Sequence, residues 1–301
     1  MGRRLSGSRR KEALAFYLCI APWLFGFLVF TLGPMAFSLY FSFTDWNMFQ
    51  KPNFVGFKNY VRLFTRDRIF PKALWNTFFY AGISVPLSLF LATLLSGLLN
   101  RKLRGLRIFR TIFYLPALIP AAAMSMVFIW MLAPDTGLIN RFLGVFGVDG
   151  PAWLLDRNAV KPALIIMSLW GVGNNILLLL AGMQGIPQQL YEAARLDGAG
   201  RRQAFLHITI PMISPILFFN LVMGMIGGLQ TFTQVYIMTD GGPNNASMMM
   251  VPYLFHHAFD SYRMGYASSI AWVLFLIILG MTLLVFRSSS LWVFYESEVR
   301  R

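Results

Sequence analysis

Charged side chains are scarce in this sequence. Asp, Glu, Lys and Arg make up 13% of its 301 residues, whereas a soluble domain has about a quarter. Hydrophobic residues make up 57%, and the mean hydropathy is +0.59. The shortage of charge excludes an ordinary soluble protein and indicates that much of the chain is solvated by lipid.

Cysteine is also nearly absent, which excludes internal disulfides and cysteine-rich metal sites. The single cysteine, Cys19, lies within the first apolar segment and has no metal-ligand spacing around it. The residues before it, Phe16, Tyr17 and Leu18, lack the small residue expected beside a lipidated cysteine. We interpret Cys19 as a buried apolar residue, because free cysteine behaves as a small hydrophobe.

Six runs of the sequence are long enough to cross a bilayer and contain no charged residue. A spanning helix needs about 20 apolar residues, and a closed β-barrel would show short alternating segments instead of continuous runs. The first run exceeds the roughly 7–15 apolar residues of a signal peptide, so we expect it to remain as a membrane anchor. We predict an all-α, polytopic membrane protein that forms one domain over residues 1–301. Its predicted spans are 13–40, 78–100, 111–133, 162–183, 212–238 and 268–286.

The distribution of Lys and Arg predicts the orientation of these spans. An even number of spans puts both termini on one side, and the segments on that side carry 16 of the 26 Lys and Arg. Because basic residues collect in cytoplasmic loops, we place segment 1–12, loops 101–110 and 184–211 and the tail 287–301 in the cytoplasm. The net charge of +14 then reflects orientation, and no nucleic-acid partner is expected. Segment 44–77 is an exception, because its six basic residues lie on the other side.

The six runs also lack Asp, Glu and His, and this absence excludes several functions. Proton-coupled carriers keep ionisable side chains within the membrane as relays, so such a carrier is disfavoured, while sodium coupling through backbone carbonyls stays open. No Gly-Lys dipeptide occurs, which excludes a phosphate-binding P-loop, and neither H-E-x-x-H nor G-x-S-x-G is present. We predict no catalytic residue, no metal ligand and no cofactor bound by this chain. Any ATP that drives transport must then be hydrolysed by another subunit.

Uncharged polar and aromatic side chains in the fourth and fifth spans are candidates for a translocation pathway. A buried amide without a partner is costly, so Asn and Gln within spans face other helices or water. Hydrogen bonding between helices is the alternative interpretation. Amides, hydroxyls and aromatic rings suit a neutral, hydroxyl-rich solute such as a sugar. The candidates are Trp170, Asn174, Asn175, Asn220, Gln230, Gln234 and Tyr236.

Glycine residues in the same two spans have two interpretations. The simpler interpretation is close packing, because small residues let helices approach one another in a membrane. The alternative interpretation is that these glycines let a helix bend during transport. The residues are Gly171, Gly173, Gly182, Gly224, Gly227 and Gly228.

The loop 184–211 is patterned as two helices joined by a turn. Pro187 can occupy the first turn of a helix, and good helix formers follow it from Gln188 to Leu196. Gly198 suits the left-handed position after a helix, and a second helix is predicted from Gly200 to Thr209. An amphipathic helix on lipid headgroups is the alternative, but the first helix has mixed charge instead of a basic face.

The same loop resembles the EAA loop of permeases of binding-protein-dependent ABC importers. The resemblance rests on Glu192-Ala193-Ala194, then Gly198, then Ile208 and Pro211. The surrounding sequence E-A-A-R-L-D-G-A-G-R-R-Q-A-F-L-H-I-T-I-P is similar to the carbohydrate-uptake branch, which includes maltose-type and glycerol-3-phosphate-type permeases. Further similarity lies in segments 54–60, 239–243 and 263–268. Many relatives have an Asp near Thr233 or Gln234, and this sequence has none there.

This resemblance implies a type I ABC importer permease in the plasma membrane of a bacterium or archaeon. It implies as partners a second, different permease chain, two cytoplasmic ATPase subunits that bind ATP and Mg, an external solute-binding protein and membrane lipid. A homodimeric permease, a sodium-coupled secondary carrier and a membrane-embedded enzyme or assembly factor are the alternatives. The residues that the resemblance assigns to ATPase coupling are Glu192, Ala193, Ala194, Leu196, Asp197, Gly198, Ile208 and Pro211.

Overall fold

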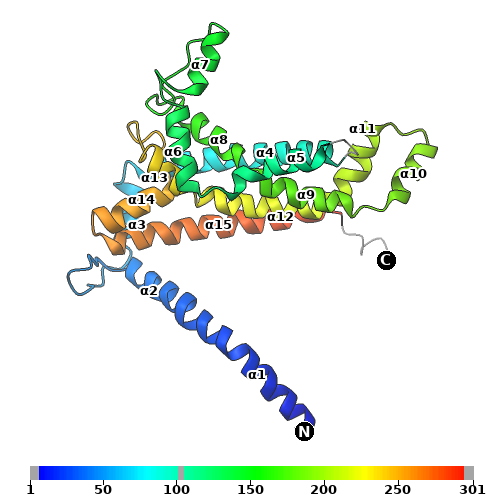
Figure 1. Cartoon of the computed structure of the whole chain (residues 1–301). Helices are drawn as coiled ribbons and strands as arrows, with labels where there is room; N and C mark the ends of the chain where they lie inside the picture. The colour runs from blue at the N-terminus through cyan, green and yellow to red at the C-terminus, as the bar shows by residue number, and fades with distance from the viewer. Residues whose placement is uncertain (1–6, 101–104, 295–301) are drawn as a thin grey trace. The chain divides into compact units, whose positions relative to one another are not determined.

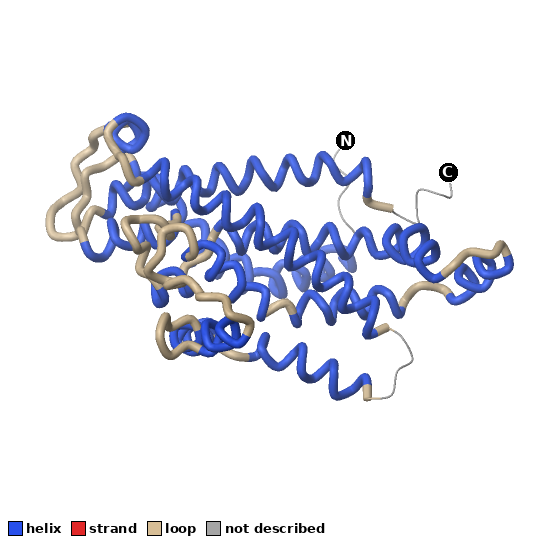
Figure 2. The backbone as a smooth tube through the Cα atoms, turned by 90° about the horizontal axis from the view of Figure 1, so that it is seen from above, coloured by secondary structure: helices blue, strands red, loops and turns tan. Residues whose placement is uncertain are grey.

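The structure is a computed structural model that describes residues 7–100 and 105–294, and over these ranges the chain is helical (Figures 1 and 2). The one β feature in these ranges is a single antiparallel bridge between Thr44 and Phe54. The α-helices are α1 (Gly7–Phe27), α2 (Gly33–Ser42), α3 (Lys58–Thr65), α4 (Phe70–Leu99), α5 (Leu106–Tyr114), α6 (Ala121–Met131), α7 (Leu138–Val145), α8 (Val160–Trp170), α9 (Gly173–Gln184), α10 (Gln188–Leu196), α11 (Arg201–Ala204), α12 (Ile210–Leu229), α13 (Thr233–Met238), α14 (Met250–Phe255) and α15 (Met264–Trp292). Short turns of other helix types join some of them: η1 (Leu28–Leu32), η2 (Leu115–Leu118), η3 (Phe205–Thr209) and η4 (His256–Asp260).

Four unbroken helical segments in the described chain are long and apolar enough to cross a membrane: Lys11–Ser42, Phe70–Leu99, Arg201–Leu229 and Met264–Trp292. Two bent pairs also qualify, Ile108–Leu118 with Ala121–Met131 and Val160–Trp170 with Gly173–Gln184. If each pair forms one span, the total is the predicted six. The all-α class is therefore confirmed.

The third span, predicted over 111–133, is sharply bent in the structure. Its two parts meet at 101°. Ile119 precedes Pro120 and is extended, with ψ 129°, and Pro120 itself has ψ 138°. The residue before a proline is pushed out of the helical region, so the chain turns at this point.

The fifth span also ends earlier than predicted. The run 212–238 was expected to be one span, but α12 ends at Leu229 and α13 begins only at Thr233. Gln230 has φ −101° and ψ 15°, and Phe232 has φ −128° and ψ −69°. Glycine lowers helix propensity by about 1 kcal/mol relative to alanine, and the pair Gly227-Gly228 lies directly before the break.

The chain forms two compact units. Unit 1 comprises residues 1–66 and 255–272, and unit 2 comprises residues 67–254 and 273–301. In unit 1, Cys19 of α1 is exposed. Its interpretation as a buried residue was wrong, because the most apolar stretch of the first span is not buried inside the chain.

In unit 2, helices α4, α9 and α12 pack side by side (Figure 1). A Cβ atom at Gly224 would lie 3.0 Å from Cγ1 of Val85, and one at Gly228 would lie 3.2 Å from Cβ of Ala81. These two glycines of α12 are four residues apart and let α4 approach closely, as small residues do in membranes. Gly227, on another side of α12, has nothing within 4 Å of a Cβ position.

Candidate functional site

Unit 2 contains a cavity of about 240 Å³ between α4, α8, α9 and α12, next to the break before α13. Within residues 7–100 and 105–294, no charged side chain lines it. Its apolar lining comes from Val85, Leu89, Gly224, Gly227 and Gly228. Its polar lining comes from Tyr80, Ser84, Ser88, Ser168, Asn175, Asn220, Thr231 and Gln234.

The hydroxyl of Tyr80 organises one side of this cavity. It accepts a hydrogen bond from Nε2 of Gln234. Ser84, Ser168 and Thr231 line the same cavity. The hydroxyl of Tyr80 therefore links α4 to α13, across the break that follows α12.

The amides of Asn175 and Asn220 line the same cavity from α9 and α12. Nδ2 of Asn175 donates to Oγ of Ser88 at 3.3 Å. Asn220 is only 5% exposed, and its Nδ2 has no hydrogen-bond partner within the described chain. Leaving a buried donor unpaired costs about 1–3 kcal/mol. The unpaired amide is therefore a group that a polar ligand or a water molecule in the cavity would satisfy.

The structure brings together three of the seven predicted pathway residues, Asn175, Asn220 and Gln234. The other four do not line the cavity. Asn174 and Gln230 are exposed, although each is close in sequence to a lining residue of its own type. Asn174 and Asn175 are successive residues of α9, so their side chains point in directions about 100° apart around the helix axis. Gln230 and Gln234 lie on opposite sides of the break between α12 and α13. The roles of all seven residues in transport stay predictions.

The remaining two, Trp170 and Tyr236, make aromatic contacts instead. The ring of Trp170 packs edge-on against Phe128 with centroids 6.1 Å apart. The ring of Tyr236 stacks on Phe232 with centroids 5.1 Å apart. Both rings are partly exposed, so they contribute to the surface of unit 2.

Sequence reasoning missed the contribution of α4. Tyr80, Ser84 and Ser88 all line the cavity, and they follow one another at intervals of four residues. That spacing puts them on one helix face. This spacing is present in the sequence. The pathway residues were predicted only in the fourth and fifth spans, because these spans contain more polar residues.

The loop 184–211 has the local structure that its sequence predicted. Helix α10 begins directly after Pro187 and ends at Leu196. Gly198 has φ +81°, its N–H bonds to the carbonyl of Arg195 at 3.1 Å, and the N–H of Ala199 bonds to that of Ala194 at 2.8 Å. This pair of bonds is the Schellman motif, in which glycine takes the left-handed position. The turn is therefore encoded by Gly198.

The second helix of the loop runs without a break into the fifth span. Helix α11 continues through the π-helical turn η3 into α12, and Pro211 lies in the first turn of α12. The hydroxyl of Tyr191 on α10 lies 2.9 Å from Oγ1 of Thr209. The ring of Phe205 lies 2.9 Å from the Cβ position of Gly97 on α4. These contacts hold α10 against the second helix of the loop, and the second helix against α4.

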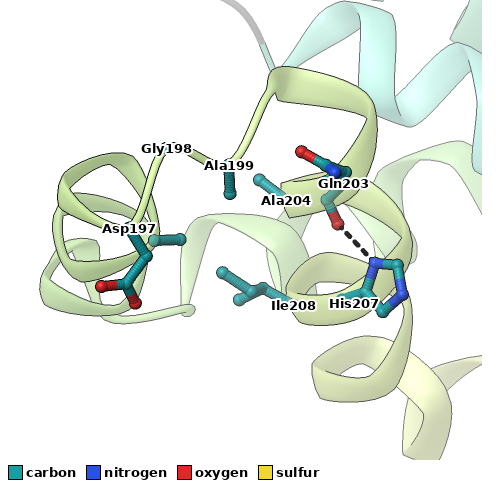
Figure 3. A pocket seen from close by; sticks show the side chains of 8 residues that line it. Asp197, Gly198, Ala199, Gln203, Ala204, His207 and Ile208 are labelled. Carbon is teal, nitrogen blue, oxygen red and sulfur yellow. Dashed lines mark hydrogen bonds between the residues drawn. The ribbon is translucent and has the colours of Figure 1, made fainter.

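A groove of about 300 Å³ separates α10 from the second helix (Figure 3). Four of the predicted coupling residues line it: Ala194, Asp197, Gly198 and Ile208. Gln203 and His207 also line it, and the prediction did not include them. Figure 3 shows His207 Nδ1 beside the backbone carbonyl of Gln203, at 3.0 Å.

The predicted coupling residues outside the groove lie mostly on the open surface of α10. Glu192 and Ala193 are exposed, and Pro211 is partly buried. Leu196 is 90% exposed.

The sequence matches a known family over residues 84–292: binding-protein-dependent transport system inner membrane components. The chain belongs to this family. It is therefore a transport subunit, a permease of an ABC importer that passes through the membrane several times. This outcome confirms the predicted resemblance to permeases of carbohydrate ABC importers.

Individual relatives cover nearly the whole permease. It is 40% identical to the probable ABC transporter permease protein YesP of Bacillus subtilis, over 97% of this chain and 96% of the relative. It is 33% identical to the diacetylchitobiose uptake system permease protein NgcF of Streptomyces coelicolor, over 91% and 82%. Among solved structures, it is similar to a chain of a bacterial ABC transporter involved in the import of the acidic polysaccharide alginate. That match has a TM-score of 0.83 and 25% identity, and it covers 94% of the permease and 97% of that chain. The predicted importer permease fold is confirmed.

Proposed function

We propose that this permease forms half of the translocation pathway for a sugar or oligosaccharide that an external solute-binding protein delivers. The cavity lined by Tyr80, Asn175, Asn220 and Gln234 carries this proposal. It presents hydroxyl and amide groups, which can donate and accept hydrogen bonds, and no charged side chain. Such a lining matches the hydroxyl groups of a neutral carbohydrate.

The relatives support the same class of solute. The names of three relatives refer to diacetylchitobiose, arabinooligosaccharides and lactose. All three solutes are carbohydrates of two or more units. The cavity and the relatives therefore favour a sugar over an ion or an amino acid.

ATP hydrolysis by partner subunits would supply the energy. The chain has no P-loop, and its spans have no carboxylate that could couple uptake to protons. We propose two cytoplasmic ATPase subunits, which bind ATP and Mg, and a second permease chain as partners. The complex would lie in the plasma membrane of a bacterium or archaeon with both termini of this chain in the cytoplasm.

The loop 184–211 would receive the motion of the ATPase. Exposed residues of α10 and the adjoining groove provide the docking surface, with Glu192 and Leu196 on α10 and Asp197 at the turn that follows. The second helix continues into α12, and α12 lines the cavity through Asn220. A displacement of the loop would therefore pass along one helix to the cavity.

Two pairs of like residues test the pathway. Asn175 and Gln234 line the cavity, whereas Asn174 and Gln230 do not. In cells with the complete importer, we expect Asn175→Ala and Gln234→Ala to lower sugar uptake about 3- to 10-fold at subsaturating solute. Each removes a hydrogen bond worth about 0.5–1.5 kcal/mol. Asn174→Ala and Gln230→Ala should leave uptake within about twofold of wild type.

The amount of permease in the membrane and the amount of ATPase that co-purifies serve as controls for these variants. Equal effects within each pair would contradict the assignment of the cavity. Uptake into vesicles that contain this chain alone, without ATP, would contradict the importer mechanism and favour a secondary carrier.

A further inference from the structure

Helix α3 in unit 1, together with Phe57 directly before it, has an apolar stripe on its surface. Phe57, Val61 and Phe64 are 70%, 57% and 62% exposed. Their spacing of four and three residues puts them on one face of the helix. We call these three residues the α3 apolar stripe.

A row of cations lies beside this stripe. Lys58, Arg62 and Arg66 are exposed and follow one another at intervals of four residues, so they form one line along the same helix. Within the described chain, none of the three forms an ion pair with a carboxylate. We call them the α3 basic stripe.

The remaining face of α3 is held by the protein. Leu63 is fully buried. Nδ2 of Asn59 donates to the carbonyls of Ser42 at 2.9 Å and Thr44 at 2.8 Å. The hydroxyl of Tyr60 donates to Oγ of Ser42 at 2.8 Å. Since Ser42 is the last residue of α2, α3 lies at the end of the first span.

The beginning of the last span lies at the same place. The guanidinium of Arg62 lies 5.2 Å from the ring centroid of Tyr266, in the first turn of α15. The N–H of Gly265 donates to the carbonyl of Trp46 at 3.0 Å. The end of the first span and the beginning of the last span therefore meet beside α3.

We propose that α3 lies in the interface of the membrane, with its apolar stripe at the acyl boundary and its basic stripe on the phosphates of anionic phospholipids. A helix with an apolar face beside Lys and Arg binds such an interface, and each basic residue near an anionic surface contributes about 1 kcal/mol. The inference depends on the membrane-spanning fold and not on the transported solute. With the orientation proposed above, the lipids belong to the outer leaflet.

This arrangement also accounts for the basic residues of segment 44–77, which are unusual for a segment on the outer side. Three of the six belong to the α3 basic stripe. Bound to lipid phosphate, they would anchor the helix at a fixed depth. A docked soluble protein would need carboxylates opposite this row, whereas a bilayer offers phosphates next to an apolar layer.

Spin labels on the full chain in bilayers test the depth of α3. In a Cys19→Ser background, labels at Val61→Cys and Phe64→Cys should collide with dissolved oxygen and be shielded from a water-soluble nickel chelate. A label at Asp149→Cys, an exposed loop residue, should show the opposite preference. Nickel accessibility at positions 61 and 64 equal to that at 149 would overturn the proposal. Shielding of both positions from oxygen and nickel would also overturn it, since a protein partner would then cover the stripe.

The second test measures anionic lipid directly. The full chain is placed in nanodiscs of phosphatidylcholine with increasing phosphatidylglycerol, and bound lipid is counted by native mass spectrometry. Lys58→Gln/Arg66→Gln should weaken phosphatidylglycerol binding about tenfold or more. Arg141→Gln/Arg157→Gln, the same charge change at two exposed residues elsewhere, should leave it unchanged. Equal retention in both double variants would overturn the assignment of the basic stripe.

Discussion

Gly173 illustrates how single residues decide the packing of unit 2. A Cβ atom there would lie 2.5 Å from the carbonyl oxygen of Phe113 and 3.0 Å from Cα of Tyr114. Both atoms belong to backbone, so neither can move aside as a flexible side chain can. Gly171, two residues earlier, has only the carbonyl oxygen of Ser168 near a Cβ position, at 3.7 Å. Of two glycines in one bend, only Gly173 is required by close packing.

This contrast gives a matched pair of substitutions. Gly173→Ala forces α5 away from α9, and overpacking of this kind typically costs about 1–3 kcal/mol. We expect the thermal unfolding midpoint of the detergent-purified protein to fall by several degrees. Gly171 has φ −86°, and the atom near its Cβ position lies at an ordinary van der Waals distance. Gly171→Ala should therefore leave the midpoint nearly unchanged. Similar midpoints for the two variants would show that Gly173 serves as a hinge and not as a packing residue.

At the scale of elements, the two-helix loop depends on one left-handed residue. No atom lies within 4 Å of a Cβ position at Gly198, so any effect of substitution there comes from its φ of +81° and not from a clash. Proline cannot adopt a positive φ, whereas asparagine tolerates the left-handed position. Substitution at Gly198 therefore changes the turn while every other residue of the groove stays the same.

We expect Gly198→Pro to leave the permease inserted in the membrane but to uncouple it from its ATPase. Co-purified ATPase and sugar uptake should both fall about tenfold or more, while Gly198→Asn should retain most of both. Glu192→Lys reverses an exposed charge on α10 and should reduce ATPase co-purification. Normal co-purification and uptake in Gly198→Pro and Glu192→Lys would disprove the coupling role.

At the scale of the whole molecule, the orientation of the spans in the membrane is a prediction that affects every loop. It decides which loops meet the ATPase and which meet the binding protein. Asp149 and Gln189 are both exposed, and the positive-inside rule puts them on opposite sides. The two loops therefore report orientation without disturbing the spans.

In a Cys19→Ser background, Asp149→Cys should react with a membrane-impermeant maleimide in intact cells. Gln189→Cys should react only after the membrane is permeabilised. The amount of labelled protein on a gel measures both. The reverse pattern would place the termini outside and would remove the loop 184–211 from reach of a cytoplasmic ATPase.

The sequence by itself determined the all-α membrane class and the two-helix loop. A long uncharged run in lipid forms a helix, because a helix satisfies all its backbone hydrogen bonds within one segment. Pro187 and Gly198 act through local backbone preferences. Tertiary structure decided which polar residues meet. The packing of α9 against α4 and α12 decides which of two successive asparagines faces the cavity, so Asn175 lines it and Asn174 does not. The break after α12 separates Gln230 from Gln234, which alone of the two lines the cavity. The role of Tyr80 depends on its hydrogen bond with Gln234, 154 positions away in the sequence, and no local pattern encodes such a contact.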